Sequence, residues 1–117
     1  MRAFALLLGF ALTATPVAAQ QAEIGYPAGS LGFESIMKSD FEAAERQIRN
    51  SGLSKYDAGR SLNLGFVLAK TGRTEQAAKL FLRVLDEDAV ELILADDSSI
   101  SSHDAARRAL AALRRPR

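Results

Sequence analysis

The sequence predicts an all-α fold of about two stacked helical hairpins, followed by a short strand or hairpin and a capping helix. Three observations predict it. A tetrapeptide returns 33 residues later, apolar residues recur at helical spacing over 30–88, and the apolar period then changes to two. A fixed period of this length is typical of helical repeats, because each unit has an apolar face that only a neighbour can cover.

The repeated tetrapeptide is Ser30-Leu31-Gly32-Phe33, which returns as Asn63-Leu64-Gly65-Phe66. Other pairs at the same offset fall in the helix that follows each copy. They are Glu42 with Glu75, Ala44 with Ala77, and Ile48 with Phe81.

Residues 1–19 have the layout of a secretory signal peptide, with Arg2 near the start, an uncharged apolar run and small residues before Gln20. A buried helix or an uncleaved anchor is the alternative. We therefore expect an exported protein, periplasmic or secreted. The chain has 15 basic and 14 acidic residues, so without Arg2 the mature protein is neutral, and no overall charge favours nucleic acid. It has no cysteine, which excludes disulfides, thiol catalysis and cysteine-based zinc sites.

Residues 20–29 are expected to be a flexible lead-in, because they contain two glycines and Pro27. Ser30 opens a short helix that stops near Ser39. The next helix begins with a capping box formed by Ser39 and Glu42, and it stops near Gly52.

The third helix is expected to run from Ser54 to Gly72, and Asp57, three residues after Ser54, completes a weaker version of the same capping box. Thr74 is the expected N-cap of the fourth helix. Its apolar stripe consists of Ala77, Phe81 and Val84. Residues 30–88 thus form two helical hairpins.

Residues 89–102 alternate apolar and polar side chains before an acidic, serine-rich turn. This pattern predicts a strand or small hairpin, with a helix continued to Ala95 as the alternative. Ser102 then caps a helix over 103–113, with Ala106, Leu110 and Leu113 buried. Residues 114–117 form a basic tail.

The second unit, at about 58–91, resembles a tetratricopeptide repeat. It has the family's Leu64-Gly65 pair, a turn glycine at Gly72, and Ala77 and Phe81 in its second helix. The first unit is a degenerate copy with Leu31-Gly32, Ser39, Ala44 and Ile48 at the matching places. Ser61 and Ala89 depart from the pattern, at places where an aromatic and a proline are common.

The resemblance implies a peptide-binding groove on the inner face of each first helix, with Asn63 holding the backbone of the bound peptide. Phe66 and Lys70 lie one and two turns after Asn63 on the same face, and Phe33 and Met37 occupy the corresponding places of the first unit. The alternative is that Phe33, Met37 and Phe66 belong to the core and that Asn63 and Lys70 are solvated.

The expected function is therefore a protein–protein interaction module without cofactor, metal or enzymatic activity. Two units make a short groove, so the hairpin and last helix complete the stack, or the chain pairs with a second copy. A different hypothesis is a structural envelope protein whose arginine-rich end contacts anionic lipid or polymer. The arginines are Arg107, Arg108, Arg114, Arg115 and Arg117. The acidic residues of 86–97 and His103 show no metal-ligand spacing.

Overall fold

The computed structural model describes residues 25–94 and 96–115, which are mainly helical with one small antiparallel sheet. The expected signal peptide and residues 20–24 of the lead-in lie outside this part. The helices are α3 (Phe33–Met37), α4 (Phe41–Arg49), α5 (Ala58–Lys70), α6 (Thr74–Asp86) and α7 (Ser102–Leu113). The sheet pairs β1 (Glu91–Ile93) with β2 (Ser99–Ser101). No helix in the described ranges is long and apolar enough to cross a membrane.

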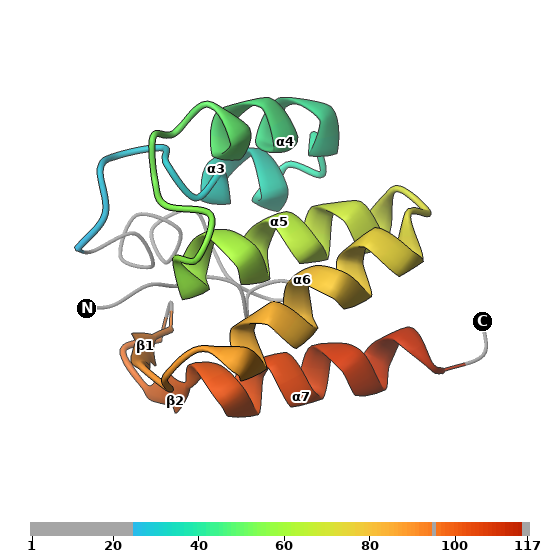
Figure 1. The fold of residues 1–117 in the computed structure, drawn as a ribbon. Coiled ribbons are helices and arrows are strands. Elements are labelled where there is room, and N and C mark those ends of the chain that lie inside the picture. The colour runs from blue at the N-terminus through green and yellow to red at the C-terminus, as the bar shows by residue number, and fades with distance from the viewer. Residues whose placement is uncertain (1–24, 95, 116–117) are drawn as a thin grey trace.

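Each helix packs against the next one along the chain, and α5 lies at the centre of the series. Figure 1 shows α3 and α4 on one side of α5, with α6 and α7 on the other. Every residue from Ser61 to Leu68 is buried. A helix that is covered on all sides belongs to the core, and the remaining elements are arranged around it.

Helices α5 and α6 approach each other closely at Gly65, in the middle of α5. A β-carbon at this position would lie 2.8 Å from Cζ of Phe81, which is too close for a real contact. The ring of Phe81, on α6, is fully buried in the space that the glycine leaves. The small residue and the aromatic thus fit together within one helix pair.

The expectation that Ser30 opens the first helix is wrong, because α3 begins at Phe33. Gly32 is the N-cap of α3 and has a left-handed φ of 63°, whereas Gly65 lies inside α5. Turn hydrogen bonds over 27–32 delay the helix to Phe33. Both glycines nevertheless lie close to the helix that follows. A β-carbon on Gly32 would lie 3.2 Å from Cδ1 of Ile48. Ile48 is the counterpart of Phe81, so each glycine approaches the matching residue of its own second helix.

Several expected helix caps are displaced by one to three residues. Asp40, not Ser39, caps α4 and accepts a hydrogen bond from the Ala43 N–H at 3.2 Å. Ser39 instead has a positive φ of 60° in the turn before it. Asp57, not Ser54, precedes α5 and accepts from the Arg60 N–H at 2.9 Å.

The caps of the last two helices also differ from expectation. Thr74 is the first residue of α6 rather than its cap, and the N-cap, Arg73, makes no side-chain capping bond. Ser101, not Ser102, caps α7 by accepting from two backbone N–H groups. Ser102 is buried, and its hydroxyl accepts from the Val90 N–H at 2.9 Å, which ties α7 to the start of the hairpin. In α7 the apolar residues that are buried are Ala105, Ala106 and Ala109, while Leu110 and Leu113 are only half-buried.

The strand pair confirms the hairpin and shows that the alternative of a helix continued to Ala95 is wrong. Leu92 pairs with Ile100, and both are buried against the helices. Asp96 holds the turn by accepting from the Ser98 N–H at 3.0 Å. The alternation of apolar and polar residues was the decisive signal, because it places one face of the hairpin on the core.

Gly65→Ala is expected to lower the free energy of unfolding by about 1 to 3 kcal/mol, because the added methyl collides with the buried Phe81 ring. Urea denaturation followed by circular dichroism measures this. The double variant with Phe81→Leu should lose less than the two single losses added together, since the smaller side chain makes room. Strict additivity would contradict the close approach.

Candidate functional site

The structure brings the sequence-predicted groove residues into two different environments. Phe33 and Asn63 are fully buried, and Phe66 is nearly so. Met37 is half-buried, and Lys70 is exposed. The expectation of a solvated Asn63 is wrong, and the expectation that the two phenylalanines are core residues is right. In this conformation only Met37 and Lys70 are open to a partner.

The side-chain amide of Asn63 is hydrogen-bonded within the protein. Its Nδ2 donates a 2.8 Å hydrogen bond to the backbone carbonyl of Leu31. Its Oδ1 is buried and has no hydrogen-bond partner among the described residues. An asparagine amide can donate to a backbone carbonyl and accept from a backbone N–H, so half of this capacity is used and half is not.

Residues 25–32, which we call the strap, are fastened to α5 at a second point. The hydroxyl of Tyr26 donates to Oδ1 of Asp57, the N-cap of α5, at 3.3 Å. Burial and the neighbouring Asp57 charge raise the pKa of Tyr26 above its usual range. A β-carbon on Gly59 would lie 2.6 Å from the Tyr26 oxygen, so only glycine lets the ring come this close.

Asn63, Phe66 and Lys70 share one face of α5, and its C-terminal end is formed by aromatic rings and the Lys70 cation. The Phe66 ring meets Phe41 of α4 edge-on, with centroids 6.2 Å apart. Nζ of Lys70 lies 5.6 Å from the Phe66 centroid, within the range of a cation–π contact. Lys70 therefore covers the edge of the core while its ammonium stays in water.

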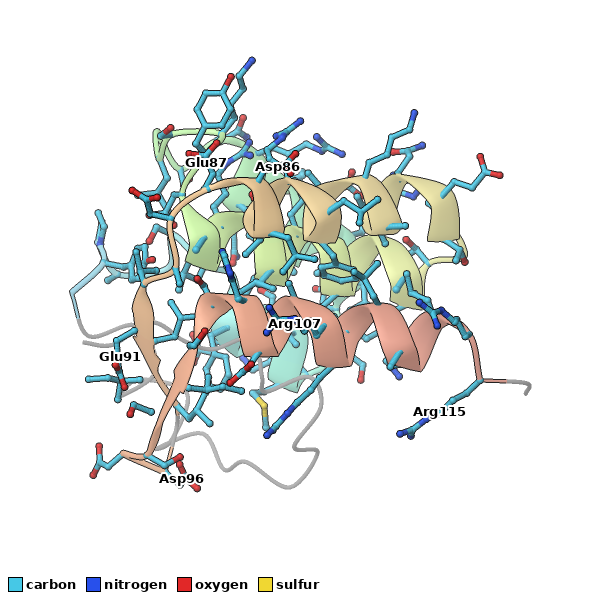
Figure 2. The ribbon with its side chains drawn as sticks, turned by 60° about the horizontal axis from the view of Figure 1, so that its bottom comes forward. Asp86, Glu87, Glu91, Asp96, Arg107 and Arg115 are labelled. Carbon is cyan, nitrogen blue, oxygen red and sulfur yellow. The ribbon has the colours of Figure 1, made fainter. Side chains whose placement is uncertain are left out.

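The arginines of the C-terminus do not form one compact patch with a single role. Arg107 is paired with Asp104 of the same helix at 2.9 Å. Arg108, Arg114 and Arg115 are exposed and form no ion pair within the described residues, and Arg117 lies outside them. Figure 2 shows Arg107 on α7 and Arg115 past its end, pointing away from the body of the fold.

The acidic residues are spread out rather than gathered. Figure 2 shows Asp86 and Glu87 at the end of α6, Glu91 on β1 and Asp96 at the turn of the hairpin. No group of three possible metal ligands occurs in the part of the chain that is described. His103 instead makes a 2.7 Å hydrogen bond between Nε2 and the Glu87 carbonyl, which fixes the α6–β1 connection to α7.

Sequence reasoning missed two contacts that hold the face in place. One is the Tyr26 anchor, whose partner is 31 residues away. The other joins Arg73 to Glu45 of α4, with Nη1 and Nη2 at 3.1 and 2.5 Å from the carboxylate oxygens. The hydrogen bond from Arg73 is the main cause that lowers the pKa of Glu45. Neither contact leaves a periodic signal, because each joins a turn or helix end to a distant element.

No family model, no curated protein and no solved structure matches this chain.

Asn63→Ala is expected to lower the free energy of unfolding by about 1 to 3 kcal/mol, because the Leu31 carbonyl loses its buried amide donor. Thermal denaturation measures the change. Asn50→Ala is the matched control, since Asn50 is exposed at the end of α4 and its loss should cost little. Equal losses for the two variants would show that the strap contact contributes nothing.

Proposed function

We propose that this protein is an exported, periplasmic interaction module of the tetratricopeptide type, and that it binds an extended segment of a partner protein along α5. The observation that carries the proposal is the hydrogen bond from Asn63 to the Leu31 carbonyl. It supports the idea that this face of α5 can hold a peptide backbone, because the strap is itself such a backbone. The module needs no cofactor and catalyses no reaction.

The packing of α5 on α6 adds support. The family's small residue and aromatic at Gly65 and Phe81 are in contact, and Ala77 is fully buried between the helices. The corresponding contact of Gly32 with Ile48 favours two related units, despite the different backbone at the two glycines. The hairpin and α7 then cover the open side of the second unit.

The partner segment would take the place of the strap, and Lys70 would meet a carboxylate on it. One fact favours displacement. The Oδ1 of Asn63 is buried and has no hydrogen-bond partner among the described residues. A partner that satisfies both the donor and the acceptor of the amide gains a hydrogen bond that the strap does not supply.

Lys70→Glu is expected to abolish capture of the partner while leaving the melting temperature nearly unchanged, because Lys70 is exposed. Residues 20–117 serve as bait on extracts of the cells that make the protein, with mass spectrometry as the readout. Lys79→Glu is the control, since Lys79 is an exposed lysine on α6. A protein that is retained by wild type and Lys79→Glu but lost with Lys70→Glu supports the proposal. Equal capture by all three contradicts it.

A second candidate function is contact with an anionic envelope surface through the C-terminal arginines. The exposure of Arg108, Arg114 and Arg115, without ion pairs among the described residues, favours it. In this case the helices only hold the basic end in position.

Truncation after Leu113 tests this candidate, since it removes the basic tail and keeps α7 whole. Wild type should bind phosphatidylglycerol vesicles at low salt and lose binding as salt screens the charges over about 10 Å at 0.1 M. The truncated chain should bind much less in sedimentation assays and melt at the same temperature. Unchanged vesicle binding after truncation would exclude the tail as the contact.

A further inference from the structure

A second surface, separate from the groove, lies where the α4–α5 loop meets the last turn of α6. We call it the basic cluster, and it consists of Arg49, Lys55, Tyr56, Arg60 and Arg83. The Lys55 carbonyl joins its parts, because it accepts 3.3 Å hydrogen bonds from Oγ of Ser61 and from Nη1 of Arg83. The loop, the start of α5 and the end of α6 therefore meet at one point.

Tyr56 is an exposed aromatic ring with cations on it. About half of the residue is accessible, at 52%. Nζ of Lys55 lies 5.2 Å from its centroid, and Cζ of Arg83 lies 5.9 Å from the same centroid. The ring thus holds two positive charges near each other at the surface, which their mutual repulsion alone would oppose.

The surroundings of Arg60 disfavour its positive charge. Arg60 lies in the first turn of α5, where the helix dipole disfavours a cation. Partial burial and the positive charges of Arg49 and Arg83 lower its pKa. Its Nε is buried and has no hydrogen-bond partner among the described residues. A buried donor without a partner is uncommon in a native structure and points to a missing acceptor.

Nearby acids neutralise only part of the cluster, since Asp57 favours the charged form of Arg60 and Glu45 pairs with Arg49. Asp57 is already used, as it accepts from the Arg60 N–H and from Tyr26. Glu45 is shared between Arg49, at 2.8 Å, and Arg73. Asp86 and Glu87 follow Arg83 along the chain, but neither forms an ion pair with it in the described residues. Positive charge is therefore left in excess at this surface.

We propose that the basic cluster binds a phosphate-type oxyanion, with Arg60 and Arg83 as the main ligands and Lys55 beside them. A guanidinium donates two parallel hydrogen bonds to such a group, and several guanidiniums can share its oxygens. The bound anion would accept from the orphan Nε of Arg60 and would remove the repulsion between the arginines. The ligand is either a free phosphate compound or the phosphate of a lipid headgroup. The site is independent of the groove and of the C-terminal tail.

The first test is a titration of the isotope-labelled protein with inorganic pyrophosphate, followed by amide chemical shifts. Saturable shifts are expected at residues 55–60 and 83. Arg60→Gln and Arg83→Gln should each weaken binding by about tenfold or more, the effect of losing a charge-assisted hydrogen bond. Without the anion, Arg60→Gln should melt at or above the wild-type temperature, because repulsion within the cluster is relieved and no side-chain hydrogen bond of Arg60 within the described residues is lost. A purely structural role for Arg60 predicts the opposite shift in melting.

Arg107→Gln is the matched control, since it removes one arginine from α7 and changes the net charge equally. It should leave pyrophosphate affinity unchanged. Shifts that stay linear, that equal those from sodium chloride at the same ionic strength, or that Arg107→Gln weakens as much as Arg60→Gln does would overturn the proposal.

Vesicles distinguish the two sources of the phosphate. Phosphatidic acid vesicles are compared with phosphatidylcholine vesicles in a sedimentation assay. Pyrophosphate binding alone identifies a free ligand, and phosphatidic acid binding that Arg60→Gln abolishes identifies a headgroup. Vesicle binding that survives Arg60→Gln, without pyrophosphate binding, assigns the contact to another surface and rejects the basic cluster.

Discussion

The burial of α5 from Ser61 to Leu68 is the constraint on which the rest of the structure depends. Two polar residues, Ser61 and Asn63, lie within its buried stretch and must find partners away from water. Both find backbone carbonyls of earlier segments, Lys55 for the serine and Leu31 for the asparagine. The α4–α5 loop and the strap are therefore fixed in place by the polar groups of a core helix.

Both candidate surfaces follow from this arrangement. The Lys55 carbonyl that accepts from Ser61 also accepts from Arg83, so the loop that covers α5 also gathers the basic cluster. The Leu31 carbonyl that satisfies Asn63 brings the strap across the face where the resemblance implies a bound peptide. A protein with a leucine at position 63 would have no such reason to hold the strap there.

Ion pairs contribute to position more than to stability. The Arg73–Glu45 pair joins the N-cap of α6 to α4. Its partners remain partly accessible, with side-chain exposures of 38% and 20%, so solvent weakens the attraction. It links the first helix pair to the second, whereas the close approaches of Gly32 to Ile48 and of Gly65 to Phe81 lie within each pair.

The sequence by itself predicted the two helices of the second unit and favoured a hairpin over a continued helix after them. These features depend on local period and on residue size, which are present in the order of the amino acids. It did not locate the caps at Asp40, Asp57 and Ser101, because adjacent serines and aspartates are equally able to cap a helix.

Only the tertiary structure decided which residues of the predicted groove are accessible. Asn63 and Lys70 share one helix face in the sequence, yet one is buried and the other is exposed. The difference comes from the strap and α4, which cover the first residue and not the second. The orphan Nε of Arg60 and the cations around Tyr56 also arise from segments that meet only after folding. Periodicity along a chain reports which side of a helix is apolar, but the depth of each residue depends on what the distant chain places over it.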